Sequence, residues 1–143
     1  MKEARTVLAD VFFMYLKAHI YHWNVEGINF PQMHEFFGNL YEELHGSIDP
    51  LAEHIRALGE YTPRNIEEMY NDKTVDCLNT AVSAKDMVAD LSTANTQVIA
   101  SLNNLFKQLE SNNKQGFMNY VADRLDQQEK HGWMLRSILK NGE

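Results

Sequence analysis

Residues 21–61, YHWNVEGINFPQMHEFFGNLYEELHGSIDPLAEHIRALGEY, contain a long helical pattern together with the candidate functional residues. Pro31 suits the first turn of a helix, and Gly59 suits a helix end. Between them, apolar residues recur at intervals of three and four, which predicts an amphipathic helix facing a core. These apolar residues are Met33, Phe36, Phe37, Leu40, Leu44, Ile48, Leu51, Ile55 and Leu58. Pro50 would crowd the carbonyl of Gly46, so we expect a local kink there.

The rest of the chain shows the same helical periodicity, and strand signals are scarce. We expect a first helix over about residues 3–24, a third that opens with a Ser83 and Asp86 capping box, and a fourth after the turn at residues 112–116. The core stripes of the last two are Met87, Leu91, Ala94, Val98, Leu102, Leu105 and Leu109, then Phe117, Val121, Leu125, Leu135 and Leu139. The sequence therefore predicts an all-α fold, an antiparallel four-helix bundle in a single domain of residues 1–143.

The connection between the second and third helices, residues 60–83, is expected to hold a short extra helix. Thr62 and Pro63 are suited to begin it. Ile66 and Met69 are the apolar residues expected to hold it against the bundle.

The first helix carries a narrow polar stripe, because Glu3, Asp10 and Lys17 recur every seven residues. Most of its remaining circumference is apolar, whereas a simple surface helix has a wider polar face. We therefore expect this helix to be buried on two sides, once in its own bundle and once against another subunit.

Composition limits the classes of function. The 143 residues carry a formal net charge of −7, which argues against general nucleic-acid affinity because phosphate binding needs surplus Lys and Arg. The single cysteine, Cys77, cannot form an intrachain disulfide, so we expect a cytoplasmic protein. Asp10 and Lys17 interrupt the apolar N-terminal run, which argues against a signal peptide. The longest apolar run, Val11–Leu16, is too short to span a membrane.

Two histidines and two carboxylates have a spacing that suits a shared metal site. Asp49 and Glu53 are four residues apart, so they share a helix face and can reach one cation. His34 precedes Asp49 by about 22 Å along a continuous helix, so one subunit cannot bring both to one metal. Two copies packed antiparallel across a two-fold axis would bring the His end of one beside the carboxylate end of the other. His22 could fold back beside His34, which gives a nitrogen and carboxylate set suited to Fe(II) or Zn(II).

Each of these residues also has an ordinary structural interpretation. A His beside a Trp at a helix end, such as His22, is commonly packed and hydrogen-bonded. Asp49 followed by Pro50 suits an N-cap and first helical turn, and Glu53 suits a solvated face. Three further histidines are either extra ligands or solvated or interface residues; they are His19, His45 and His54.

The joint spacing resembles a known family, the Dps-type mini-ferritins, also described as DNA-binding proteins from starved cells. The family's ferroxidase signature is a His-Trp pair, a His twelve positions later and an Asp-x-x-x-Glu, which matches His22, Trp23, His34, Asp49 and Glu53. The segments HWNVEGINF, YEELHGSIDPLAEHIRALG and DQQEKHGWMLRSIL are similar to the family too, so the resemblance covers nearly the whole chain.

The resemblance implies a ferritin-like fold and a hollow dodecamer with non-haem iron sites at two-fold interfaces. It implies that His22, His34, Asp49 and Glu53 bind iron, that hydrogen peroxide or O2 oxidises Fe(II), and that ferric mineral is stored in the cavity. Such chemistry protects against oxidative damage, because oxidising iron in pairs with peroxide avoids the release of hydroxyl radical. Trp23 would lie beside the iron and take up stray oxidising equivalents; an aromatic residue packed at the interface is the alternative.

Three features depart from the family pattern. Gly38 stands where many members have an Asp, four residues after the second His, which puts the second iron position in doubt. Acidic residues that commonly line the iron pores have no clear match, although Glu110 and Asp123 lie nearby, so iron uptake is expected to be slower or to use another route. The N-terminus offers only Lys2 and Arg5 and there is no Lys-rich tail, so DNA binding is not expected.

Two other functions stay open. A ferritin-type site inside each bundle needs a Glu from each of two helices and a Glu-x-x-His from each of the other two. Only Glu42 to His45 fits that motif, and the last helix has Gln128 to His131 instead. The other alternative is a shell-forming structural protein that binds DNA or another partner and has a degenerate metal site.

Overall fold

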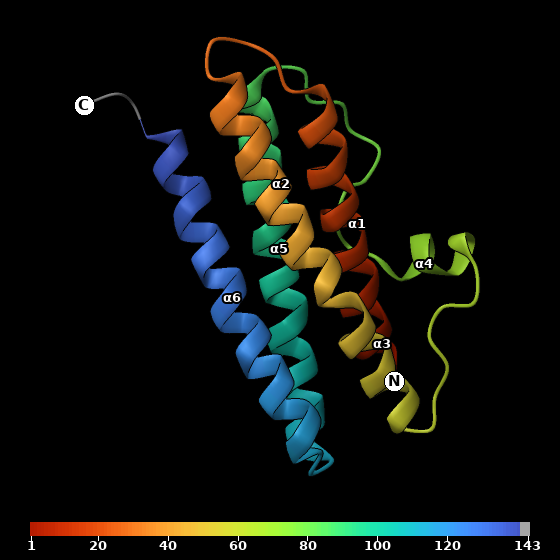
Figure 1. Cartoon of the computed structure of the whole chain (residues 1–143). Coiled ribbons are helices and arrows are strands. Elements are labelled where there is room, and N and C mark those ends of the chain that lie inside the picture. Colours follow the sequence, from red (N-terminus) through yellow and green to blue (C-terminus); the bar gives the residue numbers. More distant parts are fainter. Residues whose placement is uncertain (141–143) are drawn as a thin grey trace.

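The computed structural model describes residues 1–140, which contain six helices and no strand. The helices are α1 (Lys2–Asn24), α2 (Phe30–Gly46), α3 (Ile48–Ala57), α4 (Ile66–Asp72), α5 (Ala84–Ser111) and α6 (Gln115–Leu139). Figure 1 shows α3 continuing the line of α2, so that α1, α2 with α3, α5 and α6 form four long rods. The predicted all-α four-helix bundle with a short extra helix is confirmed. None of the described helices is both long and apolar enough to cross a membrane.

The direction of the rods follows from the long connection that holds α4. It runs the length of the bundle, so α5 points the same way as α2 and α3 (Figure 1). The rods whose backbones lie closest together are α1 with α2, α1 with α5, and α5 with α6, and each of these pairs is antiparallel. One long crossover among four helices is a known bundle topology.

The core is built from the apolar stripes that the sequence predicts. The whole stripe of α5 is buried, from Met87 to Leu109. The stripe of α2 and α3 is buried from Met33 to Ile55, with Phe36, Ile48 and Leu58 packed at its edge. Burying one such side chain stabilises the fold by about 1.5–3 kcal/mol, so these stripes are its main source of stability.

The polar stripe of α1 is covered by the chain's own connection. Asp10 is fully buried and accepts hydrogen bonds from the backbone N–H of Thr74 at 2.6 Å and from its hydroxyl at 2.7 Å. Lys17 is buried and donates to Asn79 at 2.6 Å and to Asp90 at 2.8 Å. The connection therefore supplies a second buried side of α1 within one chain, whereas burial against another subunit stays a prediction.

The short helix α4 begins later than the sequence suggests. Asn65 is its N-cap, because its side-chain oxygen accepts a hydrogen bond from the backbone N–H of Glu68 at 2.8 Å. The expected start at Thr62–Pro63 is therefore wrong. Met69 packs against the core as expected, but Ile66 is 69% exposed and does not anchor the helix.

The second predicted helix is interrupted at Ser47, next to the expected kink at Gly46. Pro50 has no N–H to donate to the carbonyl of Gly46, which breaks the helical hydrogen bonding there. The hydroxyl of Ser47 donates back to the carbonyl of Leu44 at 2.7 Å, so it does not cap α3. Asp49 lies in the first turn of α3 and not at its N-cap, so the capping interpretation of Asp49 is wrong.

Candidate metal centre

His22 and His34 come together where α1 and α2 meet at the loop of residues 25–29. His22 lies in the last turn of α1, and His34 lies near the start of α2. Their rings stack with centroids 3.8 Å apart and an angle of 17° between the planes. The structure thus brings these two predicted residues side by side.

The two histidines hold each other through crossed hydrogen bonds. Nδ1 of His22 donates to the backbone oxygen of His34, and Nδ1 of His34 donates to the backbone oxygen of His22, both at 2.7 Å. A carbonyl oxygen can only accept, so each Nδ1 must carry the hydrogen. In the neutral ring Nε2 then has a free lone pair, which is the form that binds a metal ion.

The two predicted carboxylates lie apart from this histidine pair. Asp49 and Glu53 are both exposed and lie one turn apart on α3. The α3 helix forms the far end of its rod, away from the loop that joins α1 and α2 (Figure 1). Within residues 1–140, no three His, Cys, Asp or Glu side chains form a group that could hold a metal ion. The histidine and carboxylate halves are therefore separate within one chain.

Exposed aromatic side chains border the histidine pair. Trp23 follows His22 and is 61% exposed. Phe30 is 40% exposed and lies over the ring of His34, with 5.0 Å between the centroids. Exposed aromatic residues are enriched where proteins contact each other. This part of α1 and α2 therefore has the character of a contact surface.

His19 extends the cluster by one turn of α1. Its ring stacks on Tyr41 with centroids 3.8 Å apart, and its Nδ1 lies 3.0 Å from the hydroxyl of Tyr15. Partial burial lowers the pKa of His19, and the nearby His22 and His45 lower it further. His19 is thus a packed residue, although it is close to the candidate ligands.

His45 and His54 also pack against aromatic rings. The ring centroids of His45 and Tyr15 are 5.0 Å apart. The ring of His54 stacks on Phe117 of α6, with centroids 4.6 Å apart and 10° between the planes. These contacts give both residues a structural explanation that needs no metal.

The bundle interior holds a buried polar network that sequence reasoning missed. Arg124 donates from both terminal nitrogens to the carboxylate of Glu43, one bond being 2.8 Å long, and His131 donates to the same carboxylate at 2.6 Å. Gln128 accepts from Nε of Arg124 at 2.9 Å and donates to Asn95 at 2.6 Å. Burial alone would raise the pKa of Glu43, but the hydrogen bonds from His131 and Arg124 outweigh it and lower the pKa to about 2.

This network argues against a ferritin-type site inside the bundle. The interior carboxylate of Glu43 already has a cationic partner in Arg124. The Glu42 and His45 side chains, which fit the Glu-x-x-His spacing, are both exposed. The Glu-x-x-His motif therefore lies on the surface, and the polar side chains inside the bundle hydrogen-bond to one another.

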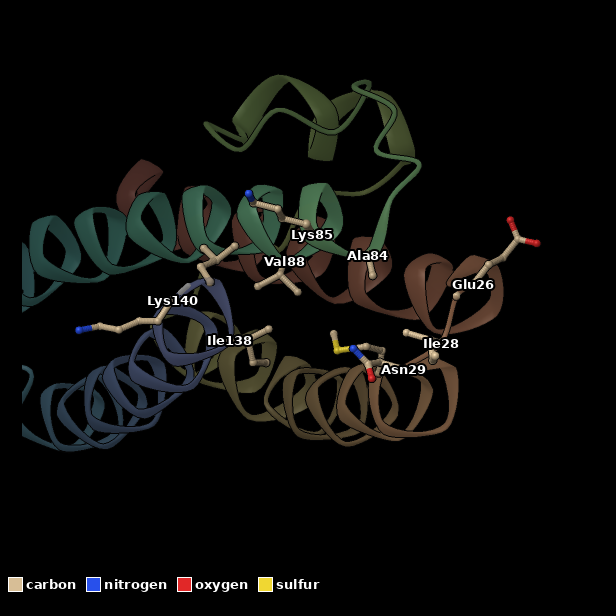
Figure 2. A pocket seen from close by; sticks show the side chains of 11 residues that line it. Glu26, Ile28, Asn29, Ala84, Lys85, Val88, Ile138 and Lys140 are labelled. Carbon is tan, nitrogen blue, oxygen red and sulfur yellow. The ribbon is translucent and has the colours of Figure 1, made fainter. Parts of the chain in front are cut away.

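A cavity of about 400 Å³ lies at the end of the bundle near the loop between α1 and α2 (Figure 2). Val88 of α5 and Ile138 of α6 line it, and Ile28 and Asn29 of the loop lie on its other side. None of the four predicted metal ligands contributes to its lining. The candidate metal centre is therefore a surface feature of α1, α2 and α3 and not this cavity.

Comparisons with known proteins agree with this architecture. Residues 2–143 match the family model described as ferritin-like domain. The chain belongs to the ferritin-like family. The DNA protection during starvation protein of Brevibacillus brevis is 30% identical over 137 residues, which cover 93% of this chain and 89% of the relative. These matches identify the chain as a Dps-type mini-ferritin, as the sequence signature indicates.

Solved structures of Dps proteins have the same fold as this mini-ferritin. Dps from Staphylococcus aureus superposes with a TM-score of 0.91 and is 29% identical, covering 98% of this chain and 94% of that one. Dps from Bacillus brevis superposes with a TM-score of 0.89 and is 27% identical, covering 97% and 93%. The likeness thus extends over the whole bundle of the mini-ferritin.

Proposed function

We propose that this mini-ferritin oxidises and stores iron, and that each of its ferroxidase sites is shared between two copies of the chain. His22 and His34 of one copy and the partner subunit's Asp49 and Glu53 bind Fe(II). Hydrogen peroxide oxidises it, and the ferric product is kept as mineral inside a hollow homo-oligomer. The family resemblance favours a dodecamer.

The crossed hydrogen bonds of His22 and His34 are the observation that carries this proposal. They fix both rings with Nδ1 protonated, so that in the neutral ring each Nε2 carries the lone pair that binds a metal ion. A hydrogen bond donated by the ring nitrogen that does not bind the metal orients a metal-binding imidazole and raises its basicity. Imidazole nitrogens combined with carboxylate oxygens suit Fe(II) and Zn(II).

The separation of the two halves supports a shared site. Asp49 and Glu53 are exposed on one face of α3, so a second chain can reach both carboxylates at once. A two-fold axis would make two equal sites, each using the histidines of one chain and the carboxylates of the other. The exposed Trp23 and Phe30 beside the histidines supply apolar surface for that contact.

The proposed reaction is balanced with peroxide as the oxidant. Two Fe(II) ions each give one electron to one molecule of hydrogen peroxide, its O–O bond breaks, and two hydroxide ions form beside two Fe(III). The negative charges of Asp49 and Glu53 favour the more highly charged ferric product. Because one peroxide takes both electrons, no hydroxyl radical is released.

An anaerobic Fe(II) titration followed by a pulse of hydrogen peroxide tests the proposal. We expect wild-type protein to bind Fe(II) stoichiometrically and to oxidise it quickly, and we expect Asp49→Ala plus Glu53→Ala to lose both properties. The matched control is Asp126→Ala plus Glu129→Ala, which removes the same charge from exposed positions on α6. The number of ions bound per subunit shows whether a second iron binds although position 38 is a glycine.

The same experiment separates the proposal from a shell with a degenerate site. Equal, slow oxidation by wild type and by the Asp49 and Glu53 variant would contradict the ferroxidase assignment. Retardation of DNA that weakens steeply with salt would then favour the binding alternative.

A further inference from the structure

The short helix α3 carries Asp49 and Glu53 and is joined to α2 through a break in the helix at Ser47. Pro50 has no N–H for the carbonyl of Gly46, so regular helical bonding does not continue across this break. The direction of α3 is therefore not set by α2 alone. Contacts with other parts of the chain must fix where the two carboxylates lie.

Core packing holds one side of α3. Leu51 and Ile55 are each only 1% exposed. At about 100° per residue, Asp49 and Glu53 lie on the opposite side of the helix from Leu51, and both are exposed. The core contacts therefore act on the face away from the carboxylates, and a roll or swing of α3 about that face would displace both of them.

Two aromatic side chains of α6 contact α3 from its flank. The Tyr120 hydroxyl donates to the backbone oxygen of Ser47, at the break, at 3.2 Å. Partial burial raises the pKa of Tyr120, so this hydroxyl keeps its hydrogen at neutral pH. Phe117 stacks on the ring of His54, with centroids 4.6 Å apart and 10° between the planes. The start of α3 and its last turn are thus both attached to α6.

We propose that His54 and Tyr120 are positioning residues that attach α3 to α6 and so place Asp49 and Glu53 for metal binding. The assignment of these carboxylates as metal ligands rests on the proposed function above. The attachment of α3 does not, because it consists of contacts within one chain without metal.

The proposal gives His54 a role as an aromatic ring and not as a metal ligand. Stacking on Phe117 needs an aromatic side chain at position 54, whereas coordination needs a ring nitrogen. His54→Phe keeps the ring and removes the nitrogens, and His54→Ala removes both. The two variants therefore separate the positioning role from the ligand role that the sequence leaves open.

The test compares Tyr120→Phe, His54→Ala and His54→Phe in the intact assembly with the control Tyr70→Phe, at an exposed tyrosine of α4. Hydrogen exchange measured by mass spectrometry on metal-free protein reports how readily residues 48–57 open. Anaerobic titration with Co(II) then gives the affinity, and the visible absorption bands of bound Co(II) report its coordination.

We expect Tyr120→Phe and His54→Ala each to speed amide exchange in α3 about fivefold, the effect of losing one hydrogen bond or one aromatic pair. Each should bind Co(II) about fivefold more weakly, because the site is complete only while α3 is in place. The absorption bands should shift, since the carboxylates approach the metal differently. His54→Phe and Tyr70→Phe should behave like wild type in all three measurements.

Two results would overturn the inference. In the first, Tyr120→Phe and His54→Ala exchange amides and bind Co(II) like the control. In the second, His54→Phe loses Co(II) while residues 48–57 exchange as in wild type, which would make His54 a metal ligand. If wild type binds no Co(II) while Tyr120→Phe and His54→Ala still speed exchange in α3, the attachment of α3 stands and the proposed function fails.

Discussion

Arg124 of α6 holds the carboxylate of Glu43 on α2 with both terminal nitrogens of its guanidinium group, 81 residues away in sequence. The side chain of Arg124 is only 4% exposed, whereas that of Glu43 is 33% exposed. Removing one partner of such a pair leaves an uncompensated buried charge, which costs more than an exposed ion pair contributes. The folded bundle is therefore more stable when the carboxylate of Glu43 is ionised.

Glu43 should give the protein a specific loss of stability in acid. Its folded-state pKa of about 2 lies below the ordinary value of 4.5, so its contribution is complete above pH 4.5 and is lost as the pH falls toward 2. Allowing for its partial exposure, we expect a contribution of about 2 kcal/mol at neutral pH. Denaturant unfolding across this range should show that Glu43→Gln flattens the pH dependence.

The control for this experiment is Glu42→Gln, a change at the exposed neighbouring residue. It should keep the acid sensitivity of the wild type. If Glu43→Gln keeps it as well, another group is responsible for the acid sensitivity.

Asp10 should be essential for attaching the long connection to the bundle. Besides the two bonds from Thr74, its carboxylate accepts from the backbone N–H of Val75 at 3.0 Å and from the hydroxyl of Ser101 at 2.6 Å. Asp10→Ala leaves the buried donors of Val75 and Ser101 without this acceptor and frees both donors of Thr74, so we expect a loss of about 3 kcal/mol or more in the free energy of unfolding. Asp126→Ala, at an exposed position of α6, is the matched control. Equal stability of the two variants in urea would show that the carboxylate is dispensable.

Trp23 should report metal binding through its fluorescence. It lies beside the candidate ligand His22, whereas Trp133 on α6 has nearly the same exposure, 60% against 61%, and serves as the control. We expect anaerobic Fe(II) or Co(II) to quench the emission of wild type and of Trp133→Phe. Trp23→Phe should lose the response while still binding metal. If Trp23→Phe keeps the response and Trp133→Phe loses it, the metal binds away from the histidine pair.

Local patterns in the sequence predicted much of this fold. The helix stripes appear at the expected residues, and the Ser83 hydroxyl accepts from the backbone N–H of Asp86 at 3.1 Å, as the capping motif indicates. The pairing of His22 with His34 was also predictable, because a short loop after α1 leaves the start of α2 beside its end. All of these features depend on residues close in sequence.

Contacts between distant segments could not be predicted in this way. The burial of Asp10 depends on residues 64 and more positions away, and the pairing of Arg124 with Glu43 depends on how α2 and α6 face each other. Gly38 is the clearest example, because the sequence shows only a missing carboxylate. Its contact with the ring of His22 is set by the distance between two packed helices.

Subunit complementation is the sharpest test of a site shared between two chains. One variant carries His22→Ala and His34→Ala, the other carries Asp49→Ala and Glu53→Ala, and each alone should be inactive. In an assembly refolded from an equal mixture, half of the two-fold interfaces pair unlike subunits, and each of these has one intact site. We therefore predict that about a quarter of the wild-type ferroxidase activity returns on mixing. Activity that stays absent in verified mixed assemblies would show that the site is not shared between two chains.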